Sequence, residues 1–122
     1  MQQKNVFGDP IEACCYDPIT GYFRDGFCRT DAFDQGSHTV CASLSAAFLD
    51  FSKRQGNDLT TPRPAHNFPG LKSGQSWCLC ASRWLEAEMA GCAPRVFLRR
   101  SNMKALDVVP MALLKEYALD LD

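Results

Sequence analysis

The cysteines and histidines supply the nucleophilic and metal-ligating chemistry of this chain, which has seven of the first and two of the second. The sharpest local feature among them is the run Cys78-Leu79-Cys80. Alternate side chains of an extended strand point to the same face, so both thiols would share one face while Trp77 takes the other. Their Cβ atoms would lie about 6.5–7 Å apart, beyond the roughly 4 Å span of a disulfide. Buried core thiols and a functional site explain this pattern about equally well.

Cys80 is the favoured candidate for a reactive thiol because of its position. It comes directly before a predicted helix whose N-cap is Ser82, and the free backbone N–H groups of a helix N-terminus stabilise an anion. The Arg83 guanidinium would add a positive charge beside the thiolate. We therefore expect Cys80 to carry the chemistry, with Cys78, His38 and Arg83 as further catalytic candidates.

His38-Thr-Val-Cys41 offers a second imidazole and thiol. Positions i and i+3 of a strand point to opposite faces, so this pair could chelate a metal only across a turn. Since Cys78 and Cys80 point one way while His38 and Cys41 diverge, we assign no metal ligand and expect that no metal is essential. A zinc-binding domain is the alternative interpretation, and the residues do not identify a cofactor.

Polar and aromatic residues in predicted turns, together with two further cysteines and a tryptophan, are candidates for binding a small ligand. Asx hydrogen bonds and local ion pairs would also explain the turn residues without any ligand. The candidate ligand contacts are Cys41, Cys28, Tyr22, Arg24, Asp58 and Trp77.

Composition and charge narrow the function classes. Apolar residues make up 46% of the chain and charged residues 22%, which excludes intrinsic disorder. The net charge of −1 offers no footprint for a nucleic-acid backbone, so we expect no nucleic-acid partner. Neither a membrane span of about 18 apolar residues nor the apolar core of a signal peptide is present. We therefore expect a soluble cytoplasmic protein without a membrane partner, in which a reducing environment keeps most thiols unpaired.

Turn signals and hydrophobic periodicity predict an α+β fold, with a small mixed or antiparallel sheet and two or three packed helices, in a single domain over residues 1–122. A long loop containing proline and glycine should occupy residues 57–76. The expected elements are short strands or hairpins within 5–44 with a tight hairpin over 17–28, a helix capped at Ser45, a strand over 77–81, a helix capped at Ser82 with Leu85 and Met89 on its buried face, a strand over 95–99 and a last helix that starts at Pro110.

Several long motifs resemble the DUF2237 domain-of-unknown-function family over nearly the whole chain. They are Thr20-Gly-Tyr-Phe-Arg-Asp-Gly-Phe-Cys28, His38-Thr-Val-Cys41, Gly56-Asn-Asp-Leu, Thr61-Pro62 and Phe68-Pro-Gly-Leu-Lys-Ser-Gly-Gln-Ser-Trp-Cys-Leu-Cys-Ala-Ser-Arg-Trp84. The resemblance implies a widespread small soluble protein, and it supplies no activity, substrate, cofactor or catalytic residue.

Three classes of function stay open at this point. The first is a thiol site or small-ligand site lined by cysteine and histidine, the second is a zinc-binding domain, and the third is an interaction module without enzymatic activity whose cysteines only pack. We rank them in that order. The sequence does not say whether the protein is an enzyme, and it does not reveal the oligomeric state.

Overall fold

A three-stranded antiparallel sheet with strand order β2-β1-β3 organises the protein in the computed structural model, which describes residues 3–121. Three helices accompany the sheet, so the predicted α+β class is confirmed. Short 3₁₀ turns at Pro64–His66, Leu98–Arg100 and Met103–Asp107 complete the elements. The strands are β1 (His38–Ser43), β2 (Ser76–Cys80) and β3 (Arg95–Val96), and the helices are α1 (Ala46–Arg54), α2 (Ala81–Met89) and α3 (Met111–Glu116).

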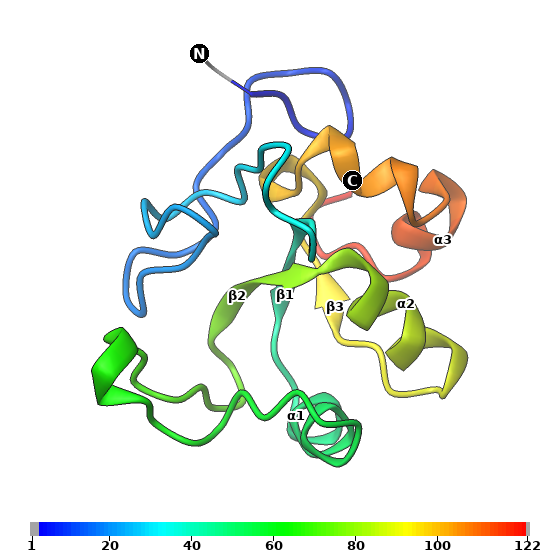
Figure 1. The fold of residues 1–122 in the computed structure, drawn as a ribbon. Coiled ribbons are helices and arrows are strands. Elements are labelled where there is room, and N and C mark those ends of the chain that lie inside the picture. The colour runs from blue at the N-terminus through cyan, green and yellow to red at the C-terminus, as the bar shows by residue number, and fades with distance from the viewer. Residues whose placement is uncertain (1–2, 122) are drawn as a thin grey trace.

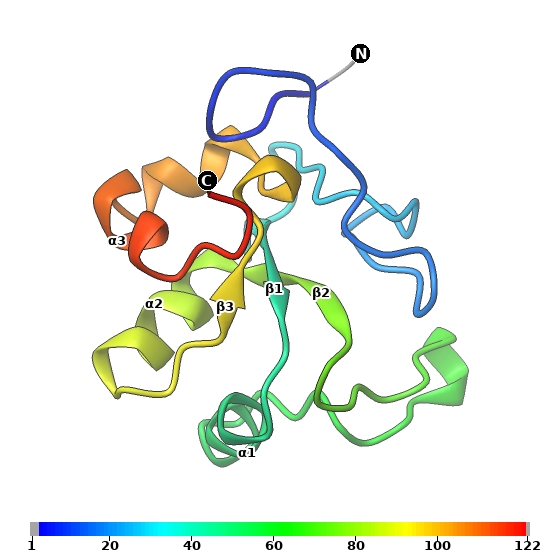
Figure 2. The same ribbon diagram turned by 180° about the vertical axis from the view of Figure 1, so that it is seen from behind.

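The sheet separates helices from loops (Figure 1). In the view from in front and in the view from behind, α2 and α3 lie on one side of the strands (Figure 2). Most of the N-terminal segment that precedes β1 lies on the other side, its first residues run beside Asn102 and Met103, and α1 lies at one end of the sheet. Loops rather than helices therefore cover the outer side of β2.

Successive side chains of β1 and β2 point to opposite faces of the sheet, and this alternation divides the buried residues into two clusters. Val40 and Leu79 are register partners, and both belong to the main hydrophobic core. Cys41 and Cys78 are the next pair, and they belong to a smaller cluster with Cys14, Cys28 and Ile11. The two faces of the sheet therefore differ in chemistry, one being hydrocarbon and the other rich in sulfur.

The first helix, α1, confirms the prediction that was made from Ser45 and Gly56. The Ser45 side chain accepts a hydrogen bond from the amide of Phe48 at 3.2 Å, which is the N-cap arrangement. Phe48 and Phe51 are buried on its inner face. Gly56, with a φ of +89°, follows the last turn in the left-handed conformation that glycine adopts without strain.

The second helix begins earlier than predicted. Its N-cap is Cys80 rather than Ser82, and no side chain caps it. Trp84 is fully buried, as are Ala81 and Ala87, whereas Leu85 is half-buried and Met89 is 80% exposed. The indole N–H of Trp84 donates to a carbonyl at 3.1 Å, so the largest apolar side chain, with a satisfied polar atom, sets the inward face.

Two predicted β elements are wrong. Residues 17–28 form bends and turns rather than a hairpin, and the bridge between Tyr16 and Ile19 is isolated. The strand predicted over 95–99 stops at Val96, because the amides of Leu98 and Arg99 donate to the carboxylate of Asp120 instead of a neighbouring strand.

The segment 117–119 completes the outer side of β3. The amide of Val96 donates to the carbonyl of Tyr117 at 2.9 Å, and the amide of Leu119 donates to the carbonyl of Val96 at 2.8 Å. On the opposite outer side, the hydroxyl of buried Thr20 accepts from the amide of Cys78 at 2.8 Å. Both outer strands thus have partners from loops. Within residues 3–121, no helix has the length and apolar character needed to cross a bilayer.

Candidate functional site

Four cysteines form two buried disulfides, which corrects the expectation that most thiols are unpaired. Cys14 is bonded to Cys41 and Cys28 to Cys78, with Cα–Cα distances of 5.7 and 5.3 Å. Cys28, Cys41 and Cys78 therefore carry no free thiol here, although sequence analysis named each as a site candidate. The free cysteines among the described residues are Cys15, Cys80 and Cys92, all of them half-buried.

Cys80 and His38 lie on neighbouring strands. They are register partners of β2 and β1, at the point where a β-bulge between His38 and Val40 interrupts the regular pairing. Both line a pocket of about 220 Å³. Its other lining residues are Trp77, Cys78 and Arg83, which were predicted, and Asn57, Leu59 and Leu79, which were not. The structure therefore brings together five of the ten predicted site residues.

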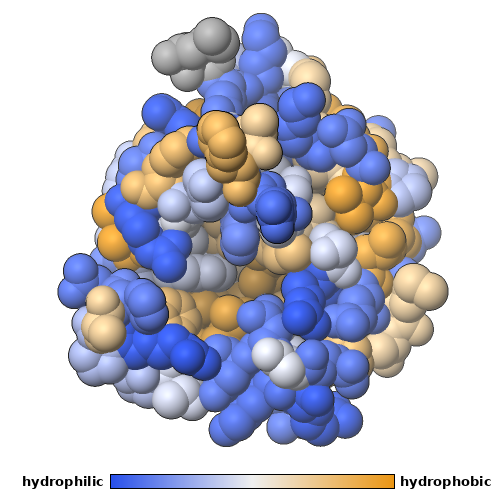
Figure 3. All heavy atoms as spheres, in the orientation of Figure 1, coloured by the Kyte–Doolittle hydropathy of each residue, from blue (hydrophilic) through white to orange (hydrophobic). Residues whose placement is uncertain are grey.

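The surface around β2 is hollowed. In the space-filling view, apolar residues lie at the bottom of a central hollow and hydrophilic residues surround it (Figure 3). A second pocket of about 350 Å³ is lined by Tyr22, Arg24, His38 and His66, so the His38 imidazole borders both pockets. Because the two pockets share His38, Tyr22 and Arg24 lie beside the first pocket.

His38 is held by a carboxylate that sequence analysis missed. The Nδ1 atom lies 2.7 Å from an oxygen of Asp34, whose side chain is 1% exposed. The other carboxylate oxygen accepts from the backbone amide of His38 and from the hydroxyl of Thr30, both at 2.9 Å. Burial by itself raises the pKa of Asp34, but these hydrogen bonds outweigh it and hold the pKa below its usual value. An ionised carboxylate therefore orients the imidazole.

Hydrogen bonding at Nδ1 decides which ring nitrogen faces the solvent. When the neutral imidazole donates its Nδ1 proton to Asp34, Nε2 carries the free lone pair. No described residue forms a hydrogen bond with Nε2. An imidazole that is fixed by a carboxylate and open at Nε2 has the arrangement of a general base.

Gly36 fixes the position of the imidazole from the other side. A Cβ atom at this residue would lie 2.8 Å from Cε1 of His38, so alanine would displace the ring. We expect Gly36→Ala to slow alkylation of Cys80 severalfold, while the unfolding free energy changes by less than about 1 kcal/mol because the loop is partly exposed. Thiol labelling and urea unfolding of the same sample would measure both. An unchanged labelling rate would contradict the role given to the imidazole.

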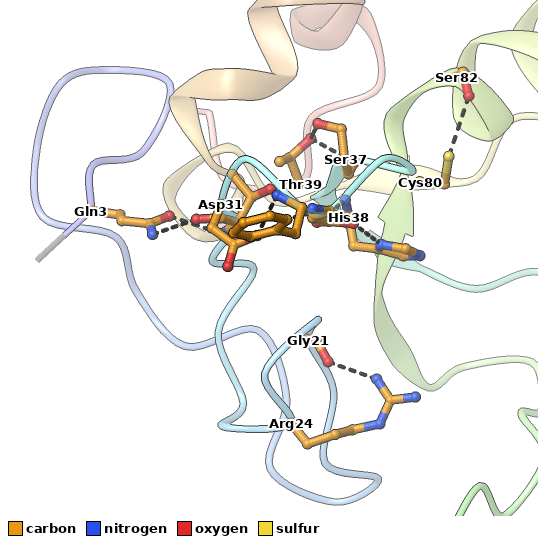
Figure 4. A network of polar contacts seen from close by, with 12 residues as sticks. Gln3, Gly21, Arg24, Asp31, Ser37, His38, Thr39, Cys80 and Ser82 are labelled. Atoms are coloured by element: carbon orange, nitrogen blue, oxygen red, sulfur yellow. Dashed lines mark hydrogen bonds and ion pairs between the residues drawn. The ribbon is translucent and has the colours of Figure 1, made fainter. Parts of the chain in front are cut away.

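The Cys80 sulfur does not point at the imidazole in this structure. Sγ is directed at the hydroxyl of Ser82, 3.2 Å away, while the His38 ring extends in another direction (Figure 4). A rotation about the Cα–Cβ bond of Cys80 changes the direction of the sulfur. The Arg83 guanidinium donates to the carbonyl of Gln55 and to Glu86, so its charge is already partly satisfied.

Two aromatic contacts extend the site towards the N-terminal loops. The Tyr22 ring stacks on the His38 ring with centroids 6.3 Å apart and an interplanar angle of 19°. The Arg24 guanidinium lies 5.1 Å from the centroid of Trp77 and donates to the carbonyl of Gly21. Tyr22, Arg24 and Trp77 therefore lie where a ligand beside His38 could contact them.

Asp58 lines neither pocket, although its neighbours Asn57 and Leu59 line the first one. Hydrogen bonds from the hydroxyl of Thr61 and from the amide and hydroxyl of Thr60 hold the pKa of the Asp58 carboxyl well below its usual value. These bonds stay within four residues, so a turn explains Asp58 without a ligand.

A larger cavity lies elsewhere and was also missed. It has a volume of about 790 Å³, and its lining includes Lys4, Asp31, Lys104 and Asp107, which carry both signs of charge. Asp34 contributes to this cavity as well. The free thiols and imidazoles do not line it, whereas Cys80 and His38 line the smaller pocket.

Comparison with known proteins gives one finding. A family model described as "Uncharacterized protein conserved in bacteria (DUF2237)" matches residues 4–118, which is nearly the whole chain. No curated protein matches the chain.

Proposed function

We propose that this chain, which belongs to the DUF2237 family, is a thiol protein that uses Cys80 as a nucleophile towards a small ligand, with His38 as its base. The observation that carries the proposal is the pairing of Cys80 with His38 across β1 and β2 at one pocket. The buried carboxylate of Asp34 behind the imidazole supports it.

The chemistry requires one proton transfer. Nε2 of His38 accepts the proton of the Cys80 thiol, and the imidazolium that forms is stabilised by the Asp34 carboxylate. The thiolate then attacks an electrophilic carbon of the ligand, forming an S–C bond while the bond to the leaving group breaks. The imidazolium returns its proton to the leaving group. Rotation of Sγ away from Ser82 precedes the first step.

The pocket suits a small ligand with negative charge. Its volume of about 220 Å³ is below the roughly 300–1,000 Å³ of sites for drug-sized molecules. Arg83 lines this pocket and Arg24 lines the adjoining one, and guanidinium groups bind carboxylate and phosphate oxygens. A small carboxylate or phosphate ester that carries an electrophilic carbon fits these features. We assign no nucleic-acid or membrane partner to this site.

We also place the protein in the cytoplasm. A reducing compartment keeps a nucleophilic thiol such as Cys80 in its active state. The two disulfides oppose this placement, but their cysteines are at most 5% exposed, which limits attack by external thiols. Fractionation of cells that produce the natural protein would test the location, and recovery outside the cytoplasm would contradict it.

Selective alkylation tests the thiol proposal. We expect iodoacetamide at neutral pH to modify Cys80 at least about tenfold faster than Cys15 and Cys92, because general-base assistance is worth 10²–10⁴-fold in catalysis. Mass spectrometry of the peptides at successive times gives the three rates in one sample. His38→Gln should remove the advantage of Cys80, and Arg83→Ala should reduce it.

His66→Gln is the matched control, because His66 borders only the adjoining pocket. It should leave the rate at Cys80 unchanged. The proposal fails if Cys80 reacts no faster than Cys15 and Cys92, or if His38→Gln and His66→Gln have the same effect. Thermal unfolding of each variant shows whether a slower rate comes from a damaged fold.

A further inference from the structure

The two disulfides lie against each other as one cluster of four sulfurs. The Sγ atoms of Cys14, Cys28 and Cys78 all lie within 4.8 Å of one another, and Cys41 is bonded to Cys14. Cys41 and Cys78 are directly opposed on β1 and β2, which fixes one half of the cluster on the sheet. The N-terminal loops supply Cys14 and Cys28.

Reduction would move these sulfurs towards the geometry of a metal site. A pair of thiol sulfurs cannot remain at bonding distance, and van der Waals contact separates them by about 3.6 Å or more. In a tetrahedral zinc site with Zn–S bonds of about 2.3 Å, neighbouring sulfurs are about 3.8 Å apart. Three of the sulfurs already lie within 4.8 Å of one another, which is near this spacing, and Cys41, now bonded to Cys14, has to move in beside them to complete the site.

We propose that the two disulfides and a zinc site are alternative states of Cys14, Cys28, Cys41 and Cys78. Two molecules of a dithiol reductant supply four electrons and four protons, which convert the two disulfides into four thiols while each dithiol becomes a cyclic disulfide. One Zn²⁺ then binds the four sulfurs as thiolates, and four protons are released to solvent. Oxidation to the disulfides expels the ion.

The four cysteine ligands determine which kind of metal ion the site would bind. Four thiolates favour a soft or borderline ion such as Zn²⁺ over Mg²⁺ or Ca²⁺, which prefer oxygen. Closed sites of four cysteines, buried on all sides, are structural rather than catalytic. This assignment differs from the sequence-based expectation, which considered only Cys78, Cys80, His38 and Cys41 and found no convergent set.

Two arginines could offset the double negative charge of such a complex. Phe27 and Phe97 pack against the sulfur cluster. The guanidinium of Arg29 lies 4.9 Å from the centroid of Phe27, and that of Arg100 lies 4.2 Å from the centroid of Phe97. The buried Nε atom of Arg29 also has no hydrogen-bond partner among the described residues. Positive charge therefore flanks both rings that cover the cluster, although the Arg29 guanidinium is also paired with Asp25 at 3.5 Å.

The neighbouring pocket gives a reductant or a metal ion a route to the sulfur cluster. Cys78 lines the pocket of about 220 Å³ that also holds Cys80, so one residue of the cluster borders a solvent-connected space. A reductant and then a metal ion can approach from that side. Cys28 and Cys41 are fully buried.

Metal content under two redox conditions tests the proposal on the untagged wild-type chain. We expect protein reduced with a dithiol in the absence of oxygen to retain one Zn²⁺ per chain after gel filtration, and oxidised protein to retain none. With Co²⁺ as a probe, the reduced chain should show the intense sulfur-to-metal absorption and visible bands of tetrahedral thiolate coordination. Addition of a disulfide oxidant should release the bound Zn²⁺ to a chromogenic chelator.

Serine variants identify the ligands. Cys14→Ser and Cys78→Ser should abolish stoichiometric Zn²⁺ retention, whereas Cys15→Ser and Cys92→Ser should keep it, and circular dichroism reports whether each chain is folded. The redox comparison on the wild-type chain does not depend on the folding of any ligand variant. The proposal is overturned if reduced wild-type protein retains no Zn²⁺, if oxidised protein retains as much, or if folded Cys78→Ser still binds it.

Discussion

Replacing Cys28 and Cys78 together by alanine is expected to lower the unfolding free energy of the oxidised protein by about 4 kcal/mol. The reason is the length of the loop that this disulfide closes, since the two residues are 50 positions apart. A crosslink over a loop of this size removes many conformations from the unfolded chain. It also joins the N-terminal loops, which contain no helix or strand of their own between residues 3 and 37, to β2.

Urea unfolding in a metal-free buffer with a chelator measures this change. The pair Cys14 and Cys41, 27 positions apart, should cost somewhat less, about 3.5 kcal/mol when both are replaced. Cys15→Ala and Cys92→Ala are matched controls outside the disulfides, and we expect changes within about 0.5 kcal/mol. A loss below about 1 kcal/mol for the Cys28 and Cys78 pair would contradict the structural role of the crosslink.

Trp84→Ala should have a comparable effect, lowering the unfolding free energy by about 3–5 kcal/mol. The side chain is fully buried on the inner face of α2, and its ring packs edge-on against Tyr117 with centroids 5.2 Å apart. Its indole N–H also satisfies the carbonyl of Pro94. The substitution leaves a cavity and an unpaired carbonyl at the same point.

Thermal and urea unfolding would measure this loss, and Met89→Ala on the exposed side of the same helix is the control. We expect Met89→Ala to change the unfolding free energy by less than about 0.5 kcal/mol. If the two variants had similar stability, the inward face assigned to α2 would be wrong. Because Cys80 is the N-cap of this helix, Trp84→Phe should preserve Cys80 labelling better than Trp84→Ala does.

The sequence correctly predicted elements whose ends are set by interactions between residues that are close in the sequence. The helix after Ser45 follows from a capping hydroxyl and a glycine beyond its end, which act within a few residues. The start of α2 was misplaced because Ser82 is a good capping residue, yet β2 runs directly into the helix at Cys80. The hairpin over residues 17–28 failed because its turn residues serve irregular loops held by distant contacts, among them the Cys28–Cys78 disulfide.

The candidate site likewise contains residues that the sequence could indicate and residues that it could not. His38, Cys80, Arg83 and Trp77 could be named from residue type and expected position, and the structure gathers them at one pocket. Asp34 was missed because its spacing of four from His38 is uninformative in a loop without a regular period. The pairing of cysteines could not be predicted either, since separations of 27 and 50 residues depend on the tertiary fold rather than on spacing.

The pairing of Val96 with the segment 117–119 has a consequence for any shortened form of the protein. Strand β3 is only two residues long, and that segment occupies its outer hydrogen-bonding groups. Truncation before Tyr117 would leave these groups free to recruit a strand from another molecule, and open sheet edges of this kind promote aggregation. Shortened chains would therefore tend to self-associate for reasons unrelated to the thiol site.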